Sequence, residues 1–487
     1  MIFSAIILFN NNGGPMTNMW KNCILFIPAF LLISANISFS KPFNEVWMEI
    51  YSDNNKVGYI QRTVSGAENN RKINEKTLIN INLLGVETEM SIISEYHLKD
   101  NKINSFSYNV DSSSVELKLK GEIQDEKLTI VDLADEKTQE FKLKHNYIVS
   151  SLLPEYIIEN GLKEGSSFEV YIFDPVNIYT GYDPELLIAR VKVFGKEKLD
   201  TKSGIHSAYK VSVNFLGGEN TVWITENGKP VLEKFEPSLT AVISSRSEAL
   251  KKRNKAFDIA EKTSIVSNKY IHNPREVKKM IVKIHGLENI EGLNVNDGNY
   301  QVLSNKKLTV SSPDLTSPDL YSLPYEGSDF MEYLESSILI QKDNQAIIQQ
   351  VEKIVKSEKN PIVAVKLIND WTYRNIKKIP TVSIPSAVEV LNTLEGDCNE
   401  HAVLFAALAR AAGIPVKVIL GVVYLDGRFY YHAWNEVYIG KWVPIDSTFG
   451  QIPADATHLK IIEGDISRSP DILKVVGKMK LEVIETK

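Results

Sequence analysis

Residues 397–413 constrain the fold most, because their order specifies a helix with a defined start and end. Asp397 and Glu400, three residues apart, form a variant of the capping box that starts a helix. An apolar run from Ala402 to Ala412 follows, and Gly413 is a natural helix terminator. The pattern predicts a well-specified helix with Cys398 in its first turn.

Three further helices are expected just before this one. Asp343 can cap a helix that runs to about Ser357, with apolar residues at helical spacing on its inner face. Asn360-Pro361 supplies a capping Asn and a Pro at the first helical position of a second helix. Ser386 to Glu389 is a capping box before a short third helix.

The sequence from about Trp47 to Leu250 is typical of β structure. Asn227-Gly228 between two apolar runs indicates a hairpin, and residues 149–159 favour one helical interruption. We expect long antiparallel strands, forming a curved open sheet that acts as a scaffold or recognition module. The alternating runs separated by Gly, Asn and Asp turns include Thr77–Leu83, Glu89–Glu95, Val115–Leu119 and Ala208–Phe215.

At 487 residues the chain is too long for one core, so several domains are expected. The patterns predict an α+β protein with a β-rich domain at 41–250 and an irregular β/linker region at 251–335. The Ser/Pro-rich stretch Ser311-Ser312-Pro313 to Ser317-Pro318 within that region suggests a linker or a lid. A separate C-terminal domain is expected at 336–487.

The first forty residues have the layout of a secretory signal peptide. They contain no Asp or Glu, one basic residue (Lys21), an apolar run from Cys23 to Ile33 and the small-residue pattern Ser38-Phe39-Ser40. We expect cleavage near Ser40 and a periplasmic or extracellular protein. The alternative is an uncleaved N-terminal membrane anchor, for which the run is shorter than the ~20 residues of a spanning helix.

Charge argues against some partners. The formal net charge is −6, and Lys and Arg do not gather into a basic stripe, so nucleic acid and anionic lipid are not expected partners. The sequence has no Gly-rich phosphate loop, and nothing in it requires a metal or another cofactor.

Cys398 would be the only cysteine left after cleavage, because the other one, Cys23, lies in the signal peptide. An intramolecular disulfide is then excluded, and the thiol is either a buried apolar group or a reactive one. The N-terminus of a helix favours an anion, which lowers the pKa of a thiol placed there. The position therefore favours a reactive Cys398.

A reactive thiol needs a base and a residue that orients the base. Residues 430–438 and 442–447 read as two strands around a turn at Gly440. If Val437 pairs with Val443, the apolar residues share one face, and His432, Trp434 and Asp446 share the other. Asp446 is then a diagonal neighbour of His432, within side-chain reach, whereas a slip of one residue would separate them. Asn435 is left on the core face without an explanation.

Each residue also has an ordinary interpretation. His432 alone would be a half-exposed strand histidine, and Asp446 a turn-capping carboxylate. His401, one turn from Cys398, suggests a metal site with Glu400, but no second ligand pair has metal spacing. We therefore expect His401 to lie on a solvated helix face. The combination of Cys398, His432 and Asp446 outweighs the single interpretations.

Three ordered motifs resemble the transglutaminase-like superfamily. They are Gly396-Asp397-Cys398 with the helix end Arg410 to Pro415, the strand His432 to Val437, and the strand Trp442 to Thr448, and Ser386-Ala387 fits the same pattern. The resemblance covers roughly residues 343–448. It implies a papain-like α+β core in a catalytic domain at 336–487, with Cys398 as nucleophile, His432 as base and Asp446 as orienting residue. Trp434 is a candidate for lining the substrate pocket.

The implied chemistry is attack of the Cys398 thiolate on an amide of a protein or peptide substrate, giving a thioester. If water resolves the thioester, the protein is a peptidase or amidase. If an amine resolves it, the protein is a cross-linking acyltransferase. Hydrolysis is favoured for an exported chain surrounded by water. Two alternatives are a cell-envelope binding module that keeps the fold without the chemistry, and a β-rich region that carries the function itself.

Overall fold

The computed structural model describes most of the chain from Asn44 onwards. Two compact units are present, unit 1 with residues 28–82 and 86–258 and unit 2 mainly with residues 259–487. The described ranges are 44–67, 69–83, 86–112, 116–134, 137–235, 238–253, 255–287, 290–316, 320–379 and 385–487, with the short strands β1 (Ile2–Phe3) and β2 (Ile27–Pro28). The features of the predicted signal peptide, from Lys21 to Ser40, otherwise lie outside these residues, and its cleavage stays a prediction. None of the helices in the described ranges is both long and apolar enough to cross a membrane.

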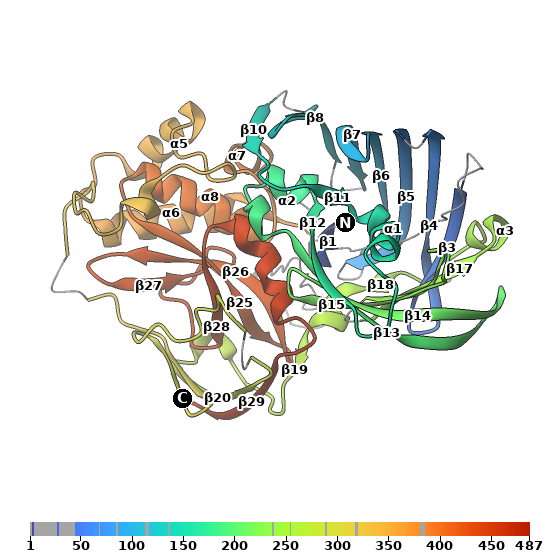
Figure 1. The fold of residues 1–487 in the computed structure, drawn as a ribbon. Coiled ribbons are helices and arrows are strands. Elements are labelled where there is room, and N and C mark those ends of the chain that lie inside the picture. Colours follow the sequence, from blue (N-terminus) through green and yellow to red (C-terminus); the bar gives the residue numbers. More distant parts are fainter. Residues whose placement is uncertain are drawn as a thin grey trace. The chain divides into compact units, whose positions relative to one another are not determined.

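Unit 1 is built on one 16-stranded sheet whose strands are long and bent (Figure 1). The path starts at β10 and ends at β11, so the sheet is open. Neighbours with a described register pair antiparallel, except that β11 runs parallel to β12 and β18 parallel to β5. In path order the strands are β10 (Thr138–Lys142), β9 (Lys127–Asp132), β8 (Glu116–Gln124), β7 (Lys102–Asp111), β6 (Val86–Lys99), β5 (Asn70–Leu83), β4 (Asn55–Ala67), β3 (Asn44–Ser52), β17 (Leu239–Ser244), β16 (Pro230–Phe235), β15 (Gly218–Ile224), β14 (Gly204–Phe215), β13 (Ile188–Thr201), β12 (Ser167–Phe173) and β11 (Tyr147–Val149), with β18 (Phe257–Asp258) on β5.

The strands, the hairpin and the helical interruption predicted for this region are confirmed, while its role as a scaffold or recognition module stays a prediction. The four alternating runs fall within β5, β6, β8 and β14, although Val115 lies outside the described residues. The Asn227-Gly228 turn joins the paired strands β15 and β16, with Gly228 at a φ of 78°. The helical interruption is the 3-10 turn η1 (Ser150–Leu152) followed by α1 (Leu153–Glu159). The remaining helical elements of unit 1 are α2 (Pro175–Tyr179), η2 (Pro184–Leu186) and α3 (Arg246–Ala249).

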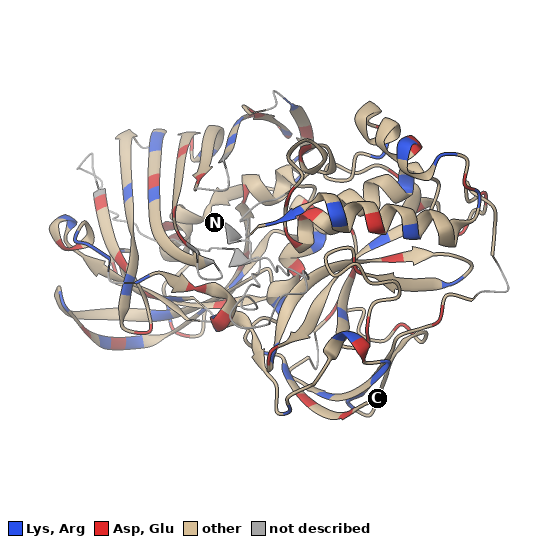
Figure 2. Cartoon of the chain, turned by 180° about the vertical axis from the view of Figure 1, so that it is seen from behind, with Lys and Arg blue, Asp and Glu red and all other residues tan. Residues whose placement is uncertain are grey.

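The alternation of buried and exposed residues explains why these segments form strands. Along β9, Leu128, Ile130 and Asp132 are buried while Lys127 is exposed, the two-residue period of a sheet with one covered face. Lys and Arg alternate with Asp and Glu on many of the strands and helices that Figure 2 shows. This interspersed pattern agrees with the absence of a basic stripe in the sequence.

Unit 2 combines two sheets with a group of helices. The first sheet has the order β19-β26-β25-β28, with β27 also paired to β26, and the second has the order β21-β22-β20-β29. The strands are β19 (Ile265–Val266), β20 (Lys279–His285), β21 (Gln301–Ser304), β22 (Lys307–Ser311), β25 (Val416–Leu425), β26 (Arg428–Tyr438), β27 (Trp442–Ile445), β28 (His458–Gly464) and β29 (Lys480–Thr486), with a separate pair β23 (Lys377–Lys378) and β24 (Glu395–Gly396). The helical elements are α4 (Ile259–Thr263), η3 (Pro274–Glu276), η4 (Met331–Leu334), α5 (Gln345–Val355), α6 (Pro361–Asn375), α7 (Ala387–Thr393), α8 (Cys398–Ala411) and η5 (Ile466–Lys474).

The segment predicted as an irregular linker region is more regular than its sequence indicates. It supplies β20, β21 and β22, and β20 also pairs with the C-terminal strand β29. The apolar residues of β20 therefore lie in one sheet with those of β29, about 200 residues later in the sequence. Local sequence patterns do not reveal such a long-range pairing. The predicted boundaries at 250 and 335 stay predictions, and Ser317-Pro318 lies outside the described residues.

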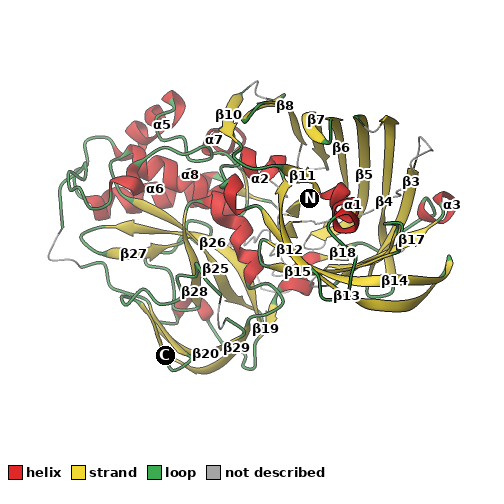
Figure 3. Ribbon diagram, in the orientation of Figure 1, coloured by secondary structure: helices red, strands yellow, loops and turns green. Residues whose placement is uncertain are grey.

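Helix α8 forms the centre of unit 2. It packs against α5, α6 and α7 on one side and against β25 and β26 on the other (Figure 3). Every residue from Cys398 to Arg410 is buried, as expected for a helix that is apolar almost all round. Asn435 of β26, unexplained by the sequence, donates its side-chain N–H to the carbonyl of Ala402 at 3.1 Å. This amide therefore connects the sheet to the first turns of α8.

The predicted helix starts are confirmed with one correction. Asn360 caps α6 and Ser386 caps α7, each by accepting a backbone N–H. The prediction that Asp343 caps α5 is wrong, because Asn344 takes that role and its Oδ1 accepts the N–H of Ala346 at 2.9 Å. Asp343 instead accepts a hydrogen bond from Ser336.

We expect Asn344→Ala to lower the free energy of unfolding by about 1 kcal/mol, because the substitution removes this cap. The matched control Asp343→Ala removes an exposed carboxylate and should change it by no more than about 0.5 kcal/mol. Urea unfolding of the protein, followed by fluorescence, measures both. A larger loss for Asp343→Ala than for Asn344→Ala would contradict the assignment of the cap.

Candidate active site

Cys398 lies where the sequence predicts, at the first position of α8. Asp397 Oδ1 accepts the N–H of Asn399 at 3.1 Å, and Glu400 Oε2 accepts the N–H of Asp397 at 2.9 Å, which completes the capping box. Gly396 has a φ of 149°, and a Cβ there would lie 2.2 Å from the Glu400 side chain. The turn thus holds the buried thiol at the positive end of the α8 dipole, where a thiolate is favoured.

His432 and Asp446 meet as the predicted register requires. Val437 pairs with Val443 and Glu436 with Pro444, so His432 and Asp446 are on one face. His432 Nε2 lies 2.6 Å from Asp446 Oδ2, and both side chains have no exposed surface. The half-exposed interpretation of His432 is therefore wrong.

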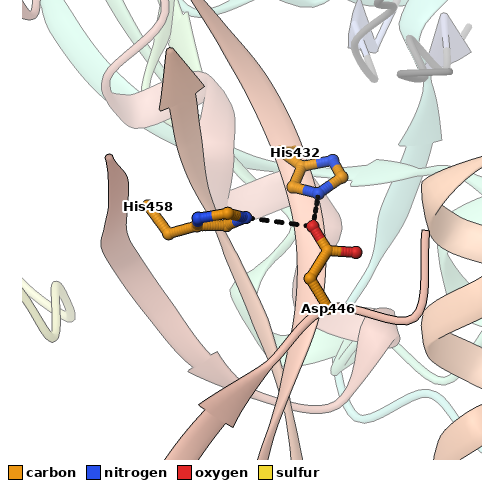
Figure 4. A group of neighbouring side chains, drawn as sticks. All are labelled: His432, Asp446 and His458. Carbon is orange, nitrogen blue, oxygen red and sulfur yellow. Dashed lines mark hydrogen bonds and ion pairs between the residues drawn. The ribbon is translucent and has the colours of Figure 1, made fainter. Parts of the chain in front are cut away.

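The Asp446 carboxylate receives four hydrogen bonds. Its Oδ1 accepts the backbone N–H groups of Thr448 at 2.7 Å and Phe449 at 3.1 Å. Its Oδ2 lies near two imidazoles, His432 and also His458, whose Nε2 is 3.0 Å away (Figure 4). Four partners are about what an ionised carboxylate can accept, so this buried charge is fully hydrogen-bonded.

Electrostatics favour an ionised Asp446 beside a neutral His432. Burial alone would raise the pKa of Asp446, but His432 and His458 outweigh it and hold the pKa well below its usual range. Burial lowers the pKa of His432 against the opposing pull of Asp446. Because Nε2 of His432 bonds to Asp446, a proton exchange between this imidazole and a thiol would use Nδ1.

Cys398 and the His432–Asp446 pair sit on elements in direct contact. The Asn435–Ala402 hydrogen bond joins β26, three residues beyond His432, to α8, one turn beyond Cys398. His401, on the same turn as Cys398, is close enough for Asp446 and His432 to affect its pKa. The structure thus brings the three predicted residues into one buried region of unit 2.

The expectation of a solvated His401 is wrong. Its side chain is completely buried, and its Nδ1 bonds to the carbonyl of Asp397. Burial first, then Lys378, lowers its pKa to about 3, so it is a neutral group. The cause of the error is tertiary: α8 has no solvated face, because helices cover the side that the sheet leaves open.

Trp434, the predicted pocket residue, is also buried, with 1% of its surface exposed. Its ring centre is 5.9 Å from that of His432, stacked, and 5.2 Å from that of His458, edge-on. Trp434 therefore packs the two imidazoles in place, and contact with substrate stays a prediction.

His432, Asp446 and His458 also resemble a metal-binding set, since their ligand atoms lie within 4.8 Å of one another. Ligands of a tetrahedral zinc ion, each at about 2.0–2.1 Å from it, would lie about 3.3 Å apart. The 2.6 and 3.0 Å contacts to one Asp446 oxygen are hydrogen-bond distances instead. We therefore interpret the cluster as a hydrogen-bonded group of side chains.

His458 was not predicted from the sequence. It begins β28, which is separated from β26 by β25 in the sheet, so no diagonal-neighbour rule links it to His432. The one signal is local: Asp455-Ala456-Thr457-His458 places a carboxylate three residues before an imidazole.

Parts of this chain are similar to known proteins. Residues 348–447 match the model of the transglutaminase-like superfamily. An uncharacterized protein of Haemophilus influenzae is 29% identical over 165 residues, 28% of this chain and 42% of that protein. Kyphoscoliosis peptidase of Mus musculus is 33% identical over 81 residues, 15% of this chain and 12% of the peptidase. The matches thus span less than half the length of either relative.

A solved structure of a candidate cysteine protease from Cytophaga hutchinsonii shares 18% identity, covering 43% of this chain and 86% of the other, with a TM-score of 0.28. The family match includes Cys398, His432 and Asp446. Residues 348–447 of this chain therefore form a transglutaminase-like superfamily domain.

Proposed function

We propose that the protein is an exported thiol enzyme that cleaves amide bonds through Cys398. The observation that carries the proposal is the buried His432–Asp446 hydrogen bond, at 2.6 Å, on the strand that contacts the helix of Cys398. A neutral histidine oriented by an ionised carboxylate is what a thiol needs to lose its proton. The name of a similar protein, kyphoscoliosis peptidase, supports the same class of chemistry.

In the first step His432 Nδ1 takes the proton of the Cys398 thiol, and Sγ attacks the amide carbonyl carbon. The carbonyl oxygen becomes an oxyanion, which the positive end of α8 is oriented to stabilise. The oxyanion then collapses, the C–N bond breaks, and His432 Nδ1–H protonates the leaving amine. The product is a thioester on Cys398, while Asp446 holds the imidazole in one tautomer throughout.

In the second step a nucleophile resolves the thioester. His432 takes a proton from water, the hydroxide oxygen bonds to the carbonyl carbon, and Sγ leaves with that proton to restore the thiol. An amine in place of water would give a cross-link, so transglutaminase activity is the second candidate. We favour water, because an exported protein meets it in large excess. A non-catalytic envelope-binding role would leave these groups without chemistry.

We expect the rate at which iodoacetamide alkylates Cys398 of the mature protein to rise with pH. The midpoint of this rise should lie well below the pKa of ~8.5 of a free thiol, because the helix dipole and His432 favour the thiolate. The measurement is the alkylation rate from pH 4 to 9. His432→Ala should slow the reaction near neutral pH or move the midpoint upwards. An ordinary midpoint that His432→Ala leaves unchanged would favour the binding-module interpretation.

Asp446→Asn should reduce the rate of amide turnover by on the order of 10²–10⁴, because the neutral amide no longer stabilises the imidazolium and allows the wrong tautomer. Peptide hydrolysis followed by mass spectrometry measures this loss. Thermal unfolding of the variant provides the control for folding, since Asp446 is buried. Full activity in a folded variant would exclude the role of Asp446.

The same assay separates hydrolysis from transfer. We expect hydrolysed peptides as the main product even when millimolar lysine amides are present as acceptors. Cross-linked products that outnumber hydrolysed ones under turnover would instead identify an acyltransferase.

A further inference from the structure

His458 has acceptors on both of its ring nitrogens. Nε2 lies 3.0 Å from Asp446 Oδ2, and Nδ1 lies 3.1 Å from the carbonyl oxygen of Asp455 and 3.5 Å from its Oδ1. A neutral imidazole has a single N–H, so both contacts are satisfied only when His458 carries two protons. With 1% of the side chain exposed, water cannot replace either partner.

Charge around His458 supports the same state. Burial alone would lower the pKa of His458, but Asp455 and Asp446 outweigh it and raise the pKa to about 9. Asp455 is itself held ionised, since Arg275 and His458 lower its pKa against burial. Its Oδ1 also accepts the N–H of Thr457 at 2.8 Å, which fixes the carboxylate in place.

These groups form a row of alternating charge. Arg275 Nη1 lies 2.9 Å from Asp455 Oδ2, Asp455 contacts His458, and His458 and His432 share Asp446. With a neutral His432 the row has two positive and two negative groups and no net charge. If His458 were uncharged, the row would have a net charge of −1 and would favour a proton on His432.

Other charged groups in the described part of unit 2 act on this row from further away. Burial lowers the pKa of Lys378 to about 8 against the opposing pull of Asp446, and both groups influence the pKa of the neutral His401. Lys378 Nζ instead donates to the carbonyl of Tyr373, and His401 Nδ1 bonds to the carbonyl of Asp397. His458 is thus the cation in direct contact with the triad carboxylate.

We propose that His458 is a positioning residue that, as an imidazolium at neutral pH, fixes Asp446 and keeps His432 a neutral base. The inference rests on the proposed function and extends it. His458 touches no reacting atom. It acts through Asp446, whose Oδ2 it shares with His432, and through its charge, since its ring centre lies 5.7 Å from that of His432. Its removal should therefore change the titration of His432 as well as the rate.

The test variant is His458→Gln, because a carboxamide can still donate to Asp446 but carries no charge. The probe is iodoacetate, whose negative charge makes its reaction with a thiolate sensitive to a neighbouring imidazolium. Its rate with the mature protein should fall on an alkaline limb as His432 loses its proton, and His432→Ala should lack this limb. In His458→Gln the limb should move up by about one to two pH units, the effect of one charge removed at this distance.

His97→Gln, a substitution in unit 1, is the control and should leave the limb in place. If the alkaline fall of the iodoacetate rate depends on His432 in the wild type but stays at the same pH in folded His458→Gln, the inference about His458 is overturned and the proposed function is not. A wild-type protein whose alkylation does not depend on His432 overturns the proposed function, and the inference falls with it.

A second measurement does not need a folded His458 variant. Nitrogen-15 spectra of the histidine-labelled mature protein at pH 8 should show one imidazolium signal that persists in His432→Ala, because ordinary histidines, with pKa values near 6.5, are neutral there. The absence of any such signal would also overturn the proposal.

Discussion

The Asp446 carboxylate is the contact on which the rest of unit 2 depends. A buried, ionised group is costly unless its oxygens are all paired, and here the partners come from three separate segments: β26, the turn at 448–449 and β28. The four hydrogen bonds therefore fix the positions of these segments relative to one another. Removing one partner would leave a buried charge undersatisfied, so the position of His432 and the folding of this sheet depend on the same contacts.

Helix α8 imposes the second constraint. Its small and apolar residues allow helices and sheet to approach it from every side, and Asn435 then reaches the carbonyl of Ala402. Cys398 is consequently positioned by core packing rather than by a loop. The capping box sets the start of the helix, so the thiol, the helix dipole and the histidine strand are held by rigid elements, as a preorganised site requires.

The positions of Cys398, His432 and Asp446, and most elements around them, could be predicted from the sequence because each depended on a local rule. The pairing of Val437 with Val443 follows from alternation, and it carries His432 and Asp446 to one face. The cap of α5 was misplaced by one residue because Asp343 and Asn344 are equally good capping types. The burial of His401 and the contact of His458 with Asp446 were missed for a different reason. Both depend on which elements pack together in three dimensions: the helices around α8 for His401, and the order β26-β25-β28 for His458. The apolar circumference of α8 was the signal in the sequence that pointed to its complete burial.

Burial of the site also bears on whether water or an amine resolves the proposed thioester. Cys398 and His432 are only 2% and 4% exposed, and Asp446 is fully buried. Once a thioester occupies Sγ, the resolving nucleophile must still reach its carbonyl carbon. Water needs little space and has no side-chain freedom to lose, whereas the lysine chain of an acceptor protein must be ordered along most of its length. A cross-linking enzyme on this framework would need an acceptor path that opens beside Cys398, so the close packing of α8 and β26 supports the proposal that water resolves the thioester.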